Sequence, residues 1–266
     1  MSDELVHLEI ASGVATITLD SPHNRNALSR QLVSDLARHL ESALGDERAH
    51  LIVLTGAGPA FCAGADLKEQ REANESAGNQ PRTTGLAQGG LPQILTALWE
   101  SPKPVICRLN GPARAGGLGL VAACDFAIAP ESVTFAINEV RLGVIPAIIS
   151  VVLLPKLGAG KALELFLTGE PFTAKQAVEY GLLTAVAPDG ELDATVARYV
   201  ASLRKGGPKA LAGAKRLVRD VPGMPMADAF SDMAKRSAAF FASEEAREGL
   251  RSFAEKRQPA WAEGLE

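Results

Sequence analysis

The chain has 266 residues, of which 47% are apolar and 22% are charged, a composition typical of a globular protein that buries a substantial core. Its length suits one large domain or a core with an appendage. The net charge of -4 leaves no basic surplus, which argues against a protein that binds nucleic acid through backbone phosphates.

Cysteine and histidine usage and the N-terminal residues narrow the class further. The three cysteines lack CxxC spacing and lie in apolar stretches, which indicates buried thiols in a reducing compartment. The four histidines show no ligand spacing, so we expect no metal site. The first residues are too polar for a signal peptide, and no window approaches the roughly 18 apolar residues of a membrane-spanning helix. We therefore expect a soluble cytoplasmic protein.

The hydrophobic pattern predicts alternating strands and helices up to about residue 190 and helices alone beyond it. The expected strands are residues 5–10, 14–19, 51–54, 103–109, 125–129, 133–137 and 182–187. The expected helices are residues 28–44, 91–100 and 173–180, with one more that ends near Asp125. Residues 69–90 have little periodicity, which predicts a mobile loop or a loose helix. We expect an α/β core over residues 1–195 and a helical segment over residues 196–266.

Local signals support two of these boundaries. Ser12-Gly13 marks a turn that joins the first two strands into a hairpin. Thr173 and Gln176 have the spacing of a capping box at the start of the helix 173–180, and Gly181 closes that helix.

The most informative segment is Asn110-Gly-Pro-Ala-Arg-Ala-Gly-Gly117, here called the glycine turn, which joins the strand 103–109 to an apolar helix. Glycines at such a turn let a ligand approach the main chain closely, and the new helix directs unpaired N–H groups toward it. The turn can hold an anion or stabilise an oxyanion, with Gly116 supplying one N–H.

A second loop of small residues follows the strand 51–54. It runs Thr55-Gly-Ala-Gly-Pro-Ala-Phe-Cys-Ala-Gly-Ala-Asp66 and is here called the small-residue loop. Its backbone N–H groups are accessible, as a second oxyanion donor requires, although a plain strand-to-helix connection has the same composition. Two such turns in one core favour the oxyanion interpretation, because an oxyanion hole needs two converging donors.

Glu139 is a lone carboxylate in the mostly apolar stretch 135–147. Apolar surroundings raise a carboxyl pKa and suit the group to proton transfer near neutral pH. The alternative is an exposed loop glutamate paired with Arg141. Farther along, residues 204–219 carry six Lys or Arg and no acid, which is typical of a solvated face but also of one that meets phosphates.

In combination these motifs resemble the crotonase (enoyl-CoA hydratase/isomerase) superfamily over almost the whole chain. The matching segments, in order, are residues 25–28, 61–66, 110–125, 139–143, 167–169 and 253–257. The resemblance implies a spiral of ββα units with a helical C-terminal part that builds trimers, often paired into hexamers. It also implies an acyl-CoA thioester as substrate and no separate cofactor.

The resemblance assigns roles to particular residues. The thioester carbonyl would lie between the backbone N–H groups of Ala63 and Gly116, which stabilise the enolate, and Glu139 would be the catalytic carboxylate. Lys256 matches a position that can reach the CoA of a neighbouring subunit. The full set of expected substrate and CoA contacts is Arg25, Ala27, Ala63, Gly64, Ala65, Asp66, Leu67, Gly116, Gly119 and Lys256.

Gly119 departs from the family pattern, because hydratases of the family carry a first glutamate at this position. Some hydratases of branched or carboxylated enoyl-CoAs share the glycine, so we expect a hydratase with a branched or bulky acyl substrate that fills the space beside Gly119. A 3,2-enoyl-CoA isomerase, which needs only one glutamate, is the alternative. An RNA-binding relative or an inactive CoA-binding relative is disfavoured by the acidic balance and by the intact Glu139.

Overall fold

A six-stranded sheet forms the centre of the molecule in the computed structural model, which describes residues 4–77 and 90–264. Its strand order is β1 (Val6–Ala11), β2 (Val14–Leu19), β3 (Leu51–Gly56), β4 (Val105–Arg108), β6 (Phe126–Pro130) and β9 (Ala185–Ala187). The first two strands form the expected antiparallel hairpin, and each later pair is parallel. The strands of this sheet were all predicted from the hydrophobic pattern.

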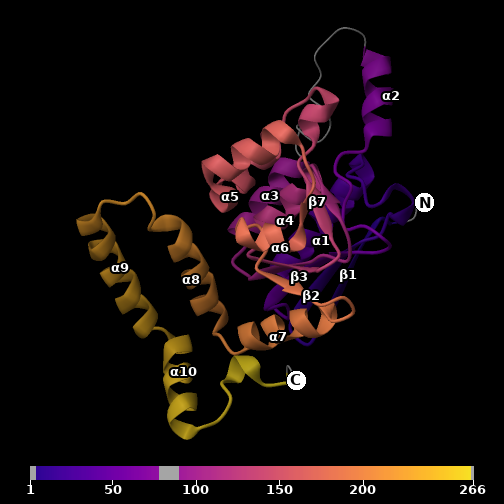
Figure 1. The fold of residues 1–266 in the computed structure, drawn as a ribbon. Coiled ribbons are helices and arrows are strands. Elements are labelled where there is room, and N and C mark those ends of the chain that lie inside the picture. Colours follow the sequence, from indigo (N-terminus) through magenta and orange to yellow (C-terminus); the bar gives the residue numbers. More distant parts are fainter. Residues whose placement is uncertain (1–3, 78–89, 265–266) are drawn as a thin grey trace.

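The parallel part of the sheet is buried on both faces, as the continuous apolar runs of its strands require. In β3, Ile52 and Leu54 belong to one core cluster, whereas Leu51 and Val53 belong to another on the opposite face. Helices α1 (Arg30–Gly45), α3 (Leu91–Glu100), α4 (Gly116–Ala123) and α5 (Ala147–Thr168) supply the first cluster. Helix α7 (Leu192–Arg204) covers the other face (Figure 1).

Helix α5 is long, and the hydrophobic pattern did not predict it. It is apolar on most sides, it contains Pro155, and Gly158 adopts a non-helical φ of 67° where two helical pieces meet. Because these features remove the 3.6-residue periodicity, the sequence offers no amphipathic signal there. The omission matters, since α5 packs along α4 beside the glycine turn.

A second, three-stranded sheet brings three distant segments together. Its order is β5 (Ala113–Arg114), β7 (Thr134–Ala136) and β8 (Phe172–Thr173). β5 and β7 are parallel, with Arg114 opposite Ala136. The short helix α6 (Ala174–Glu179) follows β8 and begins with the predicted capping box, in which Thr173 and Gln176 bond each other's backbone N–H groups.

The C-terminal helices α8 (Pro208–Asp220), α9 (Met226–Phe241) and α10 (Glu244–Glu255) project from the core as an arm (Figure 1). The expected boundary between residues 195 and 196 falls inside α7. Val196 and Val200 of that helix pack on the sheet. The core therefore extends through α7, and the separate helical segment begins with α8.

The segment 69–90 is only partly described. Helix α2 (Leu67–Ala77) covers its beginning, which confirms a helix there, whereas the rest of the prediction falls mostly on residues 78–89, outside the described part. The described residues also form short 3-10 helices at η1 (Pro22–Asn24), η2 (Glu139–Leu142) and η3 (Ala260–Ala262). Among the described residues, no helix combines the length and apolar character needed to cross a membrane.

Candidate active site

The small-residue loop and the glycine turn touch each other, as the sequence predicted. The N–H of Arg114 donates to the carbonyl of Cys62 at 3.0 Å. A Cβ placed on Gly64 would lie 2.9 Å from the Cβ of Ala115 and 3.3 Å from the nitrogen of Gly116. Since those distances leave no room for a side chain, glycine at position 64 permits the close approach of the two loops.

The backbone is strained where the glycine turn enters α4. Ala115 has φ 45° and ψ -120°, a conformation that L-residues with a Cβ rarely adopt. Gly116 and Gly117 follow as the first residues of α4, so their N–H groups have no acceptor within the helix. The conformation of Ala115 therefore sets the direction in which α4 begins and leaves the N–H groups of Gly116 and Gly117 available to a ligand.

The N–H of Ala63, the other expected oxyanion donor, is engaged in this structure. It donates to the carbonyl of Arg25 at 3.0 Å. For Ala63 to serve a thioester oxygen, this hydrogen bond has to be shared with the ligand or exchanged for it. Of the two expected donors, Gly116 is therefore the one free of this competition.

The Arg25 carbonyl owes its position to a neighbour that sequence reasoning overlooked, Asn26. Arg25 and Asn26 both have left-handed backbone conformations, with φ of 58° and 54°. The buried Asn26 side chain donates to the carbonyls of Ala57 and Ala60, each at 2.9 Å, and accepts from the N–H of Ser21 at 2.7 Å. It therefore ties residues 21–27 to the small-residue loop. The sequence signal that could have identified Asn26 is an asparagine in a turn.

Several expected CoA contacts have local structural roles. Asp66 caps the start of α2, accepting from the N–H groups of Lys68 and Glu69 at 3.0 and 3.2 Å. Its other oxygen accepts from the side chain of Asn24 at 3.1 Å. Leu67 is exposed at the first position of α2, in keeping with a surface contact. Of the remaining expected contacts, Ala27 is buried, Gly64 adjoins the glycine turn, and Ala65 forms a β-bridge with Leu28.

The parallel pairing of β5 and β7 brings the segment that carries Glu139 to the strand that leads into α4. The pairing of Arg114 with Ala136 continues with a hydrogen bond from the Ala115 N–H to the Ala136 carbonyl, 3.1 Å long. Both chains continue in the same direction beyond this pair, and Glu139 follows Ala136 by three residues, at the start of η2. The tertiary structure thus brings the segment that carries the carboxylate to the glycine turn.

The Glu139 carboxylate is half-buried and unpaired. Its Oε2 atom is buried, and within the described residues no group hydrogen-bonds it. Burial raises the pKa of Glu139 above its usual value, and a bond from its own backbone N–H offsets part of that rise. Arg141 does not pair with it, because the guanidinium bonds the Thr168 carbonyl and Glu170 instead. The carboxylate is therefore available as a proton acceptor.

This arrangement predicts a pH-dependent stability difference. Folded Glu139 releases its proton at higher pH than unfolded Glu139. In the pH window between 4.5 and the raised pKa of the folded state, the native state therefore holds more protons than the unfolded state. The wild type should lose stability across that window, while Glu139→Gln should not. We expect the variant to have the higher Tm at about pH 7 and the difference to vanish near pH 4.5. A difference that does not change with pH in thermal unfolding would contradict the unpaired carboxylate.

The space beside Gly119 is not empty, which corrects the premise of a substrate-filled gap. A Cβ on Gly119 would lie 2.6 Å from Cγ2 of Ile149 and 3.4 Å from Cδ1 of Leu95. Ile149, in the first turn of α5, is itself buried. The Cγ2 methyl group of Ile149 therefore occupies the space that the side chain of a glutamate at position 119 would need. Sequence reasoning missed Ile149 because it did not predict α5.

Lys256 caps the C-terminal end of α10 in a left-handed conformation with φ 55°. α10 belongs to the projecting arm and lies away from α4 and β7 (Figure 1). The residue therefore does not join the site of its own chain, which agrees with the expectation of a contact across subunits but does not test it.

Comparisons with known proteins agree with this geometry. The family model described as Enoyl-CoA hydratase/isomerase matches residues 9–264. An enoyl-CoA hydratase of Mycobacterium tuberculosis is 33% identical, covering 91% of both chains. An enoyl-CoA isomerase/hydratase of Mycosarcoma maydis is 32% identical, covering 93% of this chain and 92% of the relative. The crystal structure of an enoyl-CoA hydratase from Shewanella pealeana matches with a TM-score of 0.90 at 31% identity, covering 97% and 96% of the two chains.

The chain belongs to the enoyl-CoA hydratase/isomerase family, that is, to the crotonase superfamily, and it is an enzyme of this superfamily. The predicted α/β fold with a helical C-terminal region is confirmed.

Proposed function

We propose that this enzyme adds water across the 2,3 double bond of an enoyl-CoA thioester. The observation that carries the proposal is the half-buried, unpaired carboxylate of Glu139, which follows the strand paired with the entrance to α4. A carboxylate in that state activates a water for attack at C3 and governs the proton delivered to C2. The N–H groups of Gly116 and Ala63 stabilise the enolate that forms on the thioester. No separate cofactor takes part, because CoA belongs to the substrate.

One observation favours the isomerase alternative. Ile149 fills the place of a second carboxylate, so Glu139 acts without an acidic partner on α4. A 3,2-isomerase needs only one group to carry a proton between C4 and C2. The same single carboxylate therefore serves either reaction, and the products decide between them.

Mass spectrometry of the products separates the two reactions. We expect the purified enzyme to convert a linear 2-enoyl-CoA into a product heavier by one water. A 3-enoyl-CoA that is converted into its 2-enoyl isomer, with no hydration of the 2-enoyl substrate, would instead support the isomerase. Inertness toward both would contradict the proposed function.

The expected preference for branched or bulky acyl groups loses its structural support, because Ile149 closes the space that would have admitted them. Comparing kcat/KM for a linear 2-enoyl-CoA and a 3-methyl-branched one tests this preference directly. With the space closed, the branched substrate has no advantage from position 119.

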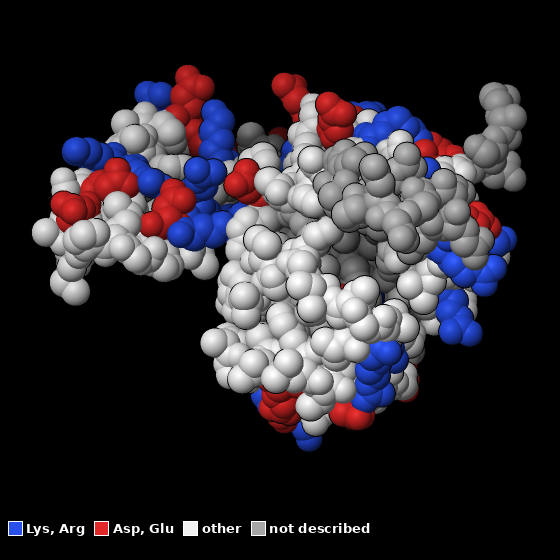
Figure 2. All heavy atoms as spheres, turned by 90° about the horizontal axis from the view of Figure 1, so that it is seen from above, with Lys and Arg blue, Asp and Glu red and all other residues white. Residues whose placement is uncertain are grey.

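We also propose that the enzyme is a trimer, or a hexamer built from two trimers. The projecting helices α8–α10 carry large apolar side chains that are 39–86% exposed in the isolated chain. These are Leu217, Val218, Met226, Phe230, Phe240, Phe241, Leu250 and Phe253. Charged side chains crowd the arm, whereas the middle of the neighbouring core face is almost free of them (Figure 2). The exposed apolar side chains of α8–α10 are characteristic of a protein–protein interface.

Light scattering at micromolar concentration should give a mass of three or six times 27.9 kDa. Phe241→Glu, in the exposed apolar surface of α9, should shift the mass toward the monomer, because it buries a charge in the interface. Lys175→Glu on the exposed face of α6 is the matched control and should leave the mass unchanged. A stable wild-type monomer would overturn the assembly.

A further inference from the structure

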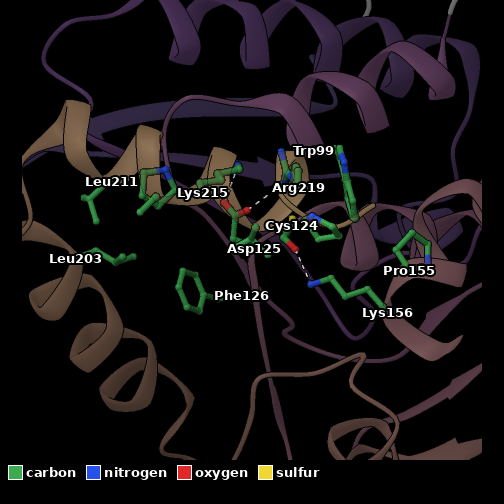
Figure 3. A pocket seen from close by; sticks show the side chains of 14 residues that line it. Trp99, Cys124, Asp125, Phe126, Pro155, Lys156, Leu203, Leu211, Lys215 and Arg219 are labelled. Atoms are coloured by element: carbon green, nitrogen blue, oxygen red, sulfur yellow. Dashed lines mark hydrogen bonds and ion pairs between the residues drawn. The ribbon is translucent and has the colours of Figure 1, made fainter. Parts of the chain in front are cut away.

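A cavity of about 830 Å³ lies between the core and α8, apart from the candidate active site. Its walls come from the C-terminal ends of α3, α4 and α7, the middle of α5, and one face of α8 (Figure 3). The volume is in the range of small-molecule sites, which run from about 300 to 1,000 Å³.

The cavity and the active site are at opposite ends of the same helices. α4 begins at Gly116 of the glycine turn and is followed at its C-terminal end by Cys124, which lines the cavity. α3 begins at Leu91, close to Gly116, and reaches the cavity at Trp99. An occupant of this cavity would therefore not contact Glu139.

Positive charge exceeds negative charge in the lining. Three cations, Lys156, Lys215 and Arg219, accompany one carboxylate, Asp125. Lys215 pairs with Asp125 at 2.7 Å and Arg219 pairs with the other oxygen at 3.3 Å. All three cations are partly buried, and this loss of hydration lowers their pKa values.

Backbone carbonyls neutralise part of this excess. Lys156 donates to the Cys124 carbonyl at 3.1 Å, and Lys215 donates to the Leu98 carbonyl at 3.4 Å, so both cations stabilise the negative ends of helices. Lys215 is then fully engaged, with Asp125 and a third acceptor, the carbonyl of Lys103.

Lys156 and Arg219 retain donors. An ammonium has three N–H groups, and the Cys124 carbonyl takes one from Lys156. A guanidinium has five, and the long bond to Asp125 takes one from Arg219, which stacks 4.6 Å from the Trp99 ring centre. The side chains of Lys156 and Arg219 approach the same end of the cavity, next to Asp125 (Figure 3).

The rest of the cavity is apolar. Phe126, Leu203 and Leu211 form the wall across from Lys156 (Figure 3), and Pro155 extends the apolar lining. An inorganic anion would leave these walls uncovered, and a neutral apolar molecule would leave the spare N–H donors of Lys156 and Arg219 without an acceptor. A ligand that satisfies both has an anionic head and an apolar body.

We propose that this cavity is a second binding site, which takes an organic carboxylate with an apolar chain of medium length. The carboxylate accepts from Lys156 and from the guanidinium of Arg219, and the chain lies against Phe126, Leu203 and Leu211. This assignment is independent of the reaction at Glu139.

Trp99 provides the readout, because a carboxylate that bonds Arg219 changes the cation stacked on this ring. The chain has two tryptophans, so the experiment uses Trp261→Phe as the background. Titration with octanoate should change the emission of Trp99 and saturate. Octanol should bind at least about tenfold more weakly, as expected when a charge-assisted hydrogen bond is lost.

Substitution then tests the head-group contact. Lys156→Gln should weaken octanoate binding about tenfold while leaving octanol binding unchanged. Lys161→Gln is the matched control, since Lys161 lies on the same helix but pairs with Glu164 outside the cavity. Arg219→Gln should repeat the effect of Lys156→Gln, and thermal unfolding verifies that each variant is folded.

Three results would overturn the proposal. Octanol that binds as well as octanoate would show that the cations do not select the ligand. Equal effects of Lys156→Gln and Lys161→Gln would move binding away from the cavity. Failure of octanoate to change the Trp99 emission of the Trp261→Phe protein would show that there is no such site, and this measurement requires no substitution at the cavity.

Discussion

Glu139→Gln should lower kcat by about 10²–10⁴-fold while the substrate KM changes little. Glutamine has nearly the shape of glutamate but cannot accept a proton at neutral pH. The raised pKa of Glu139 also predicts that kcat of the wild type falls as the pH drops through that pKa, above the usual range of a glutamate, because the base must be ionised. Steady-state kinetics on the enoyl-CoA substrate identified by the product assay measure both effects.

Glu164→Gln is the matched control for this substitution. Glu164 is an exposed carboxylate whose partner is Lys161, and neither residue contacts Arg141 or Glu139 in the described structure. Its loss should leave kcat within about threefold, as is usual for a surface ion pair remote from the chemistry. If Glu139→Gln keeps more than about a tenth of the wild-type kcat, the acid–base group is a different residue.

Gly119→Glu should be strongly destabilising by itself, and Ile149→Ala should relieve much of that effect. The new Cβ would lie 2.6 Å from Ile149 Cγ2, and overpacking of this kind costs about 1–3 kcal/mol before the charge is considered. Ile149→Ala alone should cost about 2–5 kcal/mol through the cavity it leaves. In the double variant the two changes fill each other's space, so the total should be at least about 1 kcal/mol smaller than the sum.

Chemical denaturation of the four proteins in this cycle measures the coupling. The matched control replaces Ile149→Ala with Val152→Ala, which truncates another buried residue of α5. Its effect should add to that of Gly119→Glu within about 0.5 kcal/mol. Additivity in the Ile149 cycle would show that Ile149 does not block position 119.

The double variant also tests the chemistry. A carboxylate in the first turn of α4 is favoured by the helix N-terminus and would lie near Glu139. If one carboxylate limits water addition, Gly119→Glu with Ile149→Ala should hydrate a linear 2-enoyl-CoA faster than Ile149→Ala alone. A slower reaction would indicate that Glu139 acts best without an acidic partner.

The glycine turn and the small-residue loop show how far local pattern reaches into the site. Each is recognisable because small residues follow a buried strand, and the structure brings Gly64 against Gly116 as expected. The use of the Ala63 N–H by the Arg25 carbonyl was beyond prediction, since that bond joins segments almost forty residues apart.

The sequence by itself determined the elements whose signals are local. The hairpin follows from period-two alternation around Ser12-Gly13, and α6 follows from the Thr173–Gln176 capping box. These signals are read from neighbours within a few residues, so no knowledge of the fold is needed to interpret them. The family motifs, including the segment with Glu139, were likewise recognised from their residues and their order along the chain.

Only the tertiary structure decided what surrounds those residues. The unpaired state of Glu139 depends on Arg141 bonding Glu170 and Thr168, and the closed space at Gly119 depends on Ile149. The second cavity exists because α8 carries its cations back to Asp125 across some ninety residues of sequence. Burial, charge pairing and exclusion of space are set by contacts between distant segments, and such contacts leave no periodic trace in the chain.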